Sequence, residues 1–334
     1  MRLFRTVTTV AVLALLGATG IACSNQQPTN DDSGEPNAEQ QERSGAGDGD
    51  LTVWVVTHGK TGDPFWDIVK TGVDDAGEEL GVNVTYSGDG DPKRQAELID
   101  SAVAEKVDGL VVSMANPSGL ADSVRNAVSA DIPVITINSG LEESADFGAI
   151  THVGQGERLA GEAAGEELAE HDLKNVLCVV HEQGNIGLEQ RCAGAGDTLG
   201  SELEPLVVDI SNLAEAQNTI QSKLQADPDV DGVLTLNPSV AKVAVQAKAA
   251  AQSDAELATF DVSEDVAQSI LDGDLLFAVD QQPYLQGYLP VVMLALRERN
   301  GNEVGGGQPV YSGPGIVTEQ NAAEVKRYAA EGTR

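Results

Sequence analysis

Aromatic and basic side chains are scarce in this chain of 334 residues. Phe, Trp and Tyr make up 4% of it, and 20 Lys and Arg stand against 53 Asp and Glu, a formal net charge of -33. Binding to a phosphate backbone needs a basic face, so the charge excludes a nucleic-acid partner. The carboxylates are scattered along helical segments without an Asp-x-Asp-x-Asp-Gly loop, which indicates a solvated acidic surface rather than a calcium site.

Catalytic and cofactor motifs are also missing. Gly59-Lys60-Thr61 resembles the end of a phosphate-binding loop, but Trp54 stands where the first glycine of that loop is required. The sequence has no Gly-x-Ser-x-Gly elbow and no pair of histidines at metal-binding spacing. We therefore expect no enzyme activity, no metal and no cofactor.

Long apolar runs are confined to the start of the chain. Arg2 and Arg5 precede an apolar stretch over 7–21, which is shorter than the ~20 residues that span a bilayer and is typical of a signal peptide. Gly20-Ile21-Ala22-Cys23 resembles a bacterial lipobox, with Gly20 where Leu is usual. The resemblance implies a lipoprotein signal peptide over 1–22 and acylation of Cys23; an ordinary secretory signal that contains a cysteine is the alternative.

A polar segment follows this signal. Residues 23–50 consist almost wholly of Gln, Asn, Asp, Ser, Gly, Glu and Pro and show no apolar periodicity, so they are predicted to be a disordered tether. Together the two segments predict a protein on the extracytoplasmic face of the cell membrane, held there by its lipid anchor only.

Cysteine is nearly absent as well. Of three cysteines, Cys23 is assigned to lipid, which leaves Cys178 and Cys192. In an oxidising compartment such a pair is most simply a disulfide. Free buried thiols are the alternative, and a metal site would have only His181 and Glu182 nearby to complete it.

What the sequence has instead, from Leu51 onward, is a regular alternation of short β-branched runs with helical stretches rich in Ala and Glu. The predicted strands are 51–57, 82–86, 109–113, 133–138, 149–153, 176–180, 206–210, 232–236, 257–260 and 276–279. The predicted helices include 64–80, 93–106, 119–130, 157–171, 214–226 and 240–251. Apolar strands joined through helices indicate parallel sheets buried on both faces.

An internal repeat divides this alternation in two. Val107-Asp108-Gly109-Leu110 leads to Asn116-Pro117, and Val230-Asp231-Gly232-Val233 leads to Asn237-Pro238. In both, a strand runs into an Asn that caps the next helix. The following units also correspond, ending at Asn138 in the first and Asp261 in the second. We therefore predict two doubly wound, Rossmann-like lobes.

Polar and aromatic residues gather where these strands end, which is where ligands bind in such sheets. Flat aromatic rings among carboxylate, amide and guanidinium groups predict a pocket for a polyhydroxylated molecule. Each residue alone could instead be a helix cap, a core residue or a surface charge. The candidates are His58, Asp63, Phe65, Trp66, Ser113, Asn138, Gln155, Arg191, Asn237, Asp261 and Gln281.

At this point the chain resembles a family, the solute-binding proteins of bacterial ABC sugar importers with the type I periplasmic-binding fold, close to the ribose and galactose binders. The resemblance runs from about Leu51 to the C-terminus. It is carried by Asp63-Pro64-Phe65-Trp66, Asp108-Gly109-Leu110-Val111-Val112, Ile132-Pro133-Val134-Ile135, Thr259-Phe260-Asp261 and Asp280-Gln281-Gln282-Pro283. It implies a first lobe of 51–154 plus about 281–308, a second lobe of 155–280 plus about 309–334, and a three-segment hinge.

The resemblance also implies roles for the candidate residues. Phe65 and Trp66 match the aromatic pair that sandwiches the sugar ring, with Asp63 before them; Ser113, Arg191, Asn237, Asp261 and Gln281 match polar ligand positions. One departure stands out: Asn138-Ser139 occupies the place of the Asp-Arg pair of pentose and hexose binders. A longer loop over 57–62 places His58 at the mouth of the cleft.

The implied function is capture of a small neutral sugar or polyol, a cyclitol included, by a monomer that delivers it to an ABC permease. A receptor of the same fold for a nucleoside or a furanosyl signalling molecule is the alternative.

Overall fold

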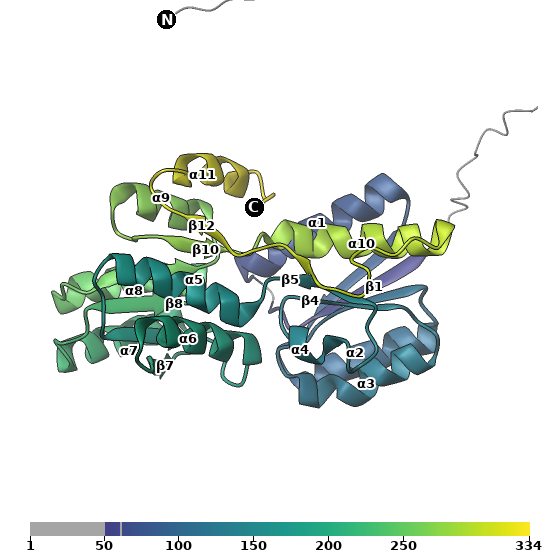
Figure 1. Cartoon of the computed structure of the whole chain (residues 1–334), viewed down its shortest axis with the longest axis horizontal. Coiled ribbons are helices and arrows are strands. Elements are labelled where there is room, and N and C mark those ends of the chain that lie inside the picture. Colours follow the sequence, from purple (N-terminus) through teal and green to yellow (C-terminus); the bar gives the residue numbers. More distant parts are fainter. Residues whose placement is uncertain (1–50, 61) are drawn as a thin grey trace, which may run out of the picture. The chain divides into compact units, whose positions relative to one another are not determined.

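The computed structural model describes residues 51–60 and 62–334 (Figure 1). The predicted signal peptide, Cys23 and the tether lie outside these residues. Within the described part of the chain, no helix combines the length and the apolarity that a membrane crossing would take.

The first sheet has six strands in the order β11-β5-β4-β3-β1-β2, and every neighbouring pair is parallel. The strands are β1 (Thr52–Thr57), β2 (Asn83–Gly88), β3 (Gly109–Ser113), β4 (Val134–Ile137), β5 (Thr151–Gly154) and β11 (Val310–Tyr311). Helices α1 (Pro64–Leu80) and α10 (Pro283–Asn300) cover one face, and α2 (Pro92–Glu105) and α3 (Pro117–Ser129) cover the other. A short helix, α4 (Leu141–Ser144), follows β4.

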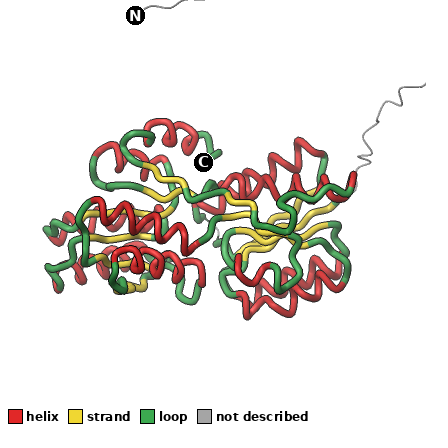
Figure 2. The backbone as a smooth tube through the Cα atoms, viewed as in Figure 1, coloured by secondary structure: helices red, strands yellow, loops and turns green. Residues whose placement is uncertain are grey.

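The second sheet also has six strands, in the order β12-β10-β9-β8-β6-β7, of which β10 and β12 are antiparallel. The strands are β6 (Val176–Val180), β7 (Glu204–Val207), β8 (Gly232–Thr235), β9 (Glu256–Phe260), β10 (Ala278–Asp280) and β12 (Gly315–Val317). One face carries α5 (Glu157–Glu170) and α6 (Ile186–Leu199); the other carries α7 (Leu213–Ala226), α8 (Pro238–Ala251), α9 (Glu264–Asp272) and α11 (Ala322–Ala330). Figure 2 shows the strands of both lobes enclosed between helices.

The two sheets repeat one plan, which confirms the predicted pair of doubly wound lobes. The order β2-β1-β3-β4-β5 of the first sheet recurs as β7-β6-β8-β9-β10 in the second. The predicted caps are also present, since the Asn116 and Asn237 side chains accept from backbone N–H groups in the first turns of α3 and α8. Asn138 and Asp261, at matching strand ends, both have left-handed backbone, with φ of 61° and 66°.

Each lobe contains one pair of helices held together at glycines. Where α1 crosses α10, Gly72 lies against the Tyr284 carbonyl and Gly287 against the Val69 carbonyl, so closely that a Cβ atom at either glycine would overlap the carbonyl oxygen. Gly194 of α6 and Gly161 of α5 occupy the same offsets within their helices and meet carbonyls in the same way. Glycine is required at these crossings because only a bare Cα allows such an approach.

The chain crosses between the lobes at three places, of which one differs from the prediction. The first two crossings follow β5 and β10. The third lies later than about 309, because Val310–Tyr311 still pairs with β5 of the first sheet. Strand β7 likewise begins before the predicted 206–210, because this exposed edge strand carries too little apolar pattern to fix its position.

Cys178 of β6 and Cys192 of α6 form the predicted disulfide, with their Cα atoms 6.0 Å apart. The bridge ties the buried centre of the second sheet to the helix that follows it. It thereby fixes the position of α6 on this face of the sheet.

We predict that Gly287→Ala destabilises the protein. Alanine in an open helical position would stabilise the helix by about 1 kcal/mol relative to glycine, whereas the overlap with the Val69 carbonyl should cost about 1–3 kcal/mol. Urea unfolding measures the change in the free energy of unfolding, and a lower value in the variant confirms the close approach of the two helices. Ser101→Ala on the exposed side of α2 is the control, with an expected change below about 0.5 kcal/mol; a more stable Gly287→Ala variant would contradict the close approach.

Candidate functional site

A cavity lies between the two lobes at the carboxyl ends of the strands. Among the predicted residues, those that line it are His58, Asp63, Phe65, Trp66, Asn138, Arg191, Asn237, Asp261 and Gln281. The other lining residues are Lys60, Ser139, His181, Glu182, Asn185, Leu188, Ile210 and Leu236. Ser113 and Gln155 are not part of the lining. Both lobes therefore contribute walls, and polar groups outnumber apolar ones.

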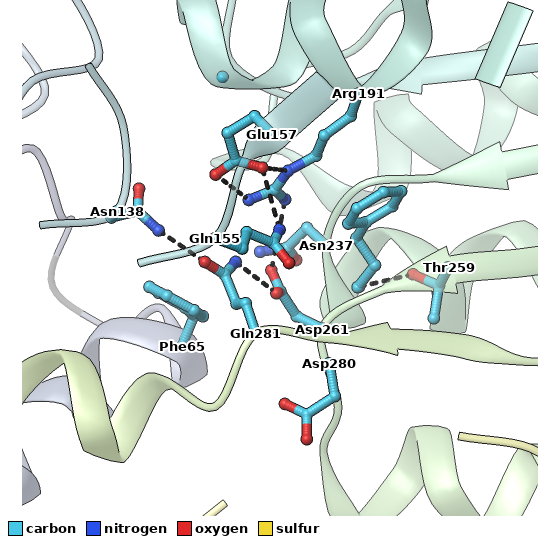
Figure 3. A network of polar contacts seen from close by, with 12 residues as sticks. Phe65, Asn138, Gln155, Glu157, Arg191, Asn237, Thr259, Asp261, Asp280 and Gln281 are labelled. Atoms are coloured by element: carbon cyan, nitrogen blue, oxygen red, sulfur yellow. Dashed lines mark hydrogen bonds and ion pairs between the residues drawn. The ribbon is translucent and has the colours of Figure 1, made fainter. Parts of the chain in front are cut away.

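An ion pair between Arg191 and Glu157 forms the polar floor of the second lobe (Figure 3). The Nε and Nη2 atoms of Arg191 donate to the two carboxylate oxygens of Glu157 at 2.6 and 3.0 Å, and the two side chains are 3% and 2% exposed. The guanidinium also lies 4.7 Å from the ring centre of Phe260. Burial alone would lower the pKa of Arg191, but the adjoining carboxylates of Glu157 and Asp261 raise it, so the group stays charged.

Glu157 was not among the predicted site residues. It is the first residue of α5, where a carboxylate favours the positive end of the helix dipole, so the sequence alone explains it as an ordinary helix start. Only the close α5–α6 crossing at Gly161 and Gly194 brings it against Arg191. The sequence contains no local pattern that predicts the contact between Glu157 and Arg191.

The side-chain amide of Gln281 connects the two matching strand ends (Figure 3). Its Oε1 accepts from Asn138 Nδ2 at 3.0 Å, and its Nε2 donates to Asp261 Oδ1 at 2.6 Å. Gln286 Nε2 also donates to Oε1, at 2.9 Å. With both ends of the amide used, its orientation is determined.

Asp261 is a buried carboxyl group whose cationic neighbour, Arg191, lies beyond hydrogen-bond distance. Burial raises its pKa to about 7, against the lowering effect of Arg191 and of the Gln281 hydrogen bond. The nearest guanidinium nitrogen, Arg191 Nη1, lies 3.9 Å from Oδ2. Asp261 therefore holds or releases a proton near neutral pH.

Asp63 contributes a second carboxyl group from the first lobe. Its Oδ1 accepts from the Phe65 N–H at 3.1 Å, which caps α1, and the Asn237 side chain of the second lobe lies near its carboxylate. Burial raises its pKa to about 6, while these two contacts lower it. Asp63 is thus both a helix cap and a contact between the lobes.

Phe65 and Trp66 form a corner rather than a sandwich. Their ring centres lie 5.0 Å apart with the planes at 86°, and both rings come from the first turn of α1. The expected placement on opposite faces of one sugar ring is therefore wrong for this pair, because opposite faces require parallel planes. Gly59 packs against the indole of Trp66, where a Cβ atom would lie 2.5 Å from Cγ.

His58 lies at the mouth of the cavity, and Ser113 contacts it from the side away from the cavity. Ser113 Oγ accepts from the His58 backbone N–H at 2.9 Å and lies 2.7 Å from Nδ1. On the other side Asn185 Nδ2 lies 3.5 Å from His58 Nε2, and Glu182 lies 3.9 Å away. Burial lowers the pKa of His58. Ser113 therefore acts behind the cavity and not on its surface.

Gln155 lies at the first crossing, where its Nε2 donates to Glu157 Oε2 at 3.0 Å. It supports the ion pair from outside the cavity. Of the other lining residues, Glu182 follows β6 and Asn185 caps α6, both at the carboxyl edge of the second sheet where the sequence predicts ligand contacts. His181, directly after β6, was not predicted as a ligand residue, although its position after a strand was the signal that could have identified it.

Comparison with known proteins gives one family for most of the chain. The family model described as periplasmic binding protein domain matches residues 53–301. A xylose/arabinose-binding protein of Sulfolobus acidocaldarius is 24% identical over 255 residues, covering 71% of this chain and 63% of that protein. A fructose import binding protein of Bifidobacterium longum is 25% identical, covering 70% of this chain and 76% of that protein.

Two solved structures share the fold. A carbohydrate transporter of Acidothermus cellulolyticus 11B, solved in complex with myo-inositol, superposes with a TM-score of 0.83 at 40% identity, covering 85% of this chain and 99% of that one. A periplasmic sugar-binding protein of Legionella pneumophila superposes with a TM-score of 0.71 at 23% identity, covering 78% and 98% of the two chains.

We predict a pH-dependent stability from Asp261. Its pKa is about 7 in the folded chain against 3.8 ordinarily, so the folded state binds the proton more tightly than the unfolded state. Stability should therefore rise as the pH falls from 7.5 to 5.5, by about 2 kcal/mol from this group, and be lost as the pH rises through 7. Asp261→Asn should remove that increment in urea unfolding without ligand.

Asp122→Asn, at an exposed position of α3, removes the same charge and is the control. It should keep the full pH dependence of the wild type. Equal pH dependence in the wild type and in Asp261→Asn would contradict the shifted pKa.

Proposed function

The chain belongs to the periplasmic binding protein domain family, and we propose that it captures a small polyhydroxylated molecule between its two lobes for delivery to an ABC permease. One observation carries the proposal: a cavity enclosed by both lobes, in which Asp63, Asp261 and Arg191 supply hydrogen-bonding groups and Phe65 and Trp66 supply apolar surface. Because a single chain lines this cavity, the proposal includes a monomer as the working unit.

Within this class we propose a cyclitol, with myo-inositol as the first candidate. The Acidothermus protein that is 40% identical to this chain was solved with myo-inositol. Asn138 and Ser139 also occupy the place of the Asp-Arg pair implied by the resemblance to pentose and hexose binders. This chain therefore has a neutral amide and hydroxyl there in place of two charged side chains. A ring with a hydroxyl on every carbon fits a lining in which donors and acceptors come from both lobes.

The ligand would stabilise the closed arrangement because only closure brings both sets of polar groups within reach. Asp63 of the first lobe and Asn237 of the second already meet across the cleft. A ligand bridging the lobes adds contacts of the same kind, and motion at the three crossings would open the cleft again.

We predict that Arg191→Lys weakens binding of myo-inositol about tenfold to a hundredfold, because lysine keeps the charge opposite Glu157 but loses the fixed fork that orients a charge-assisted donor. Isothermal titration calorimetry measures the affinity. Arg158→Lys, at an exposed position of α5 where the arginine pairs with Asp197, is the matched control and should bind as the wild type does.

The same titrations decide between ligand classes. Unchanged affinity in Arg191→Lys would place the ligand elsewhere. Binding of a sugar but not of myo-inositol would keep the function and replace the ligand. Tight binding of a purine nucleoside, without response to any sugar or polyol, would establish the receptor alternative instead.

We further propose that the protein is a lipoprotein, acylated at Cys23 and held on the extracytoplasmic face of the membrane. The support is the short apolar run before Gly20-Ile21-Ala22-Cys23 and the polar composition of 24–50. In detergent phase separation of cells that express it, the wild type should enter the detergent phase and Cys23→Ser the aqueous phase. Recovery of the wild type in the aqueous phase would contradict the anchor.

A further inference from the structure

The charged groups around the cavity cancel in pairs, with two exceptions. Arg191 and Glu157 neutralise each other at the floor. At the mouth, Lys60 and Glu182 contribute one charge of each sign. Burial lowers the pKa of both His58 and His181, the latter to about 3, so these rings are neutral at pH 7. The carboxyl groups of Asp63 and Asp261 are left over.

These two carboxyl groups receive hydrogen bonds, but among the described residues their only cationic partner is Arg191, which is shared with Glu157 and, of the two, lies near Asp261 alone. Asp261 has Gln281 on one oxygen and Arg191 Nη1 at 3.9 Å from the other, beyond hydrogen-bond distance. Asp63 accepts from the Phe65 N–H and faces Asn237, and in the described part of the chain it forms no ion pair. Glu157 takes the Nε and Nη2 donors of Arg191, so that only Nη1 faces Asp261, and no guanidinium nitrogen of the residues that the structure describes pairs with Asp63.

We propose that the cavity also accepts an amino-substituted polyol, an aminocyclitol or amino sugar, whose ammonium group pairs with Asp261 and faces Asp63. An ammonium group replaces a hydroxyl with little change in size and offers donors only, which suits two carboxylates in need of donors. The attraction is stronger in this buried site than in water. The inference rests on the proposed function, because it assumes that the ligand occupies this cavity.

We expect the cavity to bind an anionic analogue weakly, because like charges repel. A phosphate or carboxylate in the cavity would face Asp63 and Asp261, and the one guanidinium that lines it is already neutralised by Glu157. The cavity therefore discriminates between ligands of similar shape by the sign of their charge.

The pH dependence separates the amine from the neutral parent. Burial raises the pKa of Asp261 to about 7, while Arg191 on α6 and Gln281 at the crossing lower it. Glu157 on α5 and Asp63, the N-cap of α1, raise it further. The pKa of Asp63 is about 6, with Glu182 and Asp67 raising it. A protonated carboxyl group still pairs with a hydroxyl, but it no longer balances an ammonium charge. Acidification should therefore weaken the amine selectively.

Calorimetry with a matched set tests the inference: myo-inositol, its amino-deoxy isomers and myo-inositol monophosphate, each at pH 7.5 and 5.5. The best amine should bind at pH 7.5 at least as tightly as myo-inositol and lose about tenfold or more at pH 5.5, while myo-inositol changes less than about threefold. The monophosphate should bind more than about a hundredfold more weakly than myo-inositol.

Two variants assign the effect to the cavity. Asp261→Asn should weaken both ligands, but the amine more than myo-inositol, so that the advantage of the amine and its steeper pH dependence are both lost. Asp122→Asn removes the same charge from an exposed position of α3 and should change neither ligand.

The outcomes separate the two proposals. The inference is overturned if myo-inositol binds and the best amine binds more than about tenfold more weakly at pH 7.5. It is also overturned if the two ligands show equal pH dependence. Either result leaves the proposed function standing. Failure of every sugar, polyol and amine to bind overturns the proposed function, and the inference with it.

Discussion

The amide of Gln281 is the group on which the site depends. It lies at the second crossing between the lobes, and it bonds both to Asn138, directly after β4, and to Asp261, directly after β9. Those two residues occupy equivalent places in the repeated sheets and share a left-handed backbone, which Asn and Asp adopt more readily than most residues. The crossing segment therefore sets the distance between the two halves of the cavity.

The repeat gives both lobes the same scaffold and different chemistry. In each lobe a helix that follows a crossing packs through glycines on the helix that follows the lobe's first strand, α10 on α1 and α5 on α6. In the first lobe this contact supports the ring corner of Phe65 and Trp66; in the second it buries the ion pair of Glu157 and Arg191. Removing one partner of such a pair costs several kcal/mol because the other charge remains buried. The pair therefore makes Arg191 a fixed donor.

The sequence predicts the fold well because parallel strands buried on both faces leave a strong pattern. β3 and β6 have the predicted bounds. The pattern fails where burial ends: β7 is a largely exposed edge strand, and β11 and β12 are too short to show a period. The same reasoning explains the site. Residues after strands were found, whereas Glu157 depends on a helix crossing that no local pattern records, and Ser113 lies one layer behind the surface of the cavity.

Closure of the cleft depends on contacts that the protein makes with itself as well as with a ligand. The Ile186 N–H donates to the Ala115 carbonyl at 3.0 Å, and Ser139 Oγ lies 3.4 Å from Asn185 Oδ1, so the rims of the two lobes meet directly. A ligand shifts the balance between open and closed forms only by its preference for the closed one. Groups at the rim favour closure whatever is bound, so selectivity must come from the groups deeper in the cavity. Asp63, Asp261 and Arg191 are the charged groups there, and burial raises the pKa of both carboxyl groups. A ligand that donates to these carboxylates therefore gains most from the deep part of the cavity.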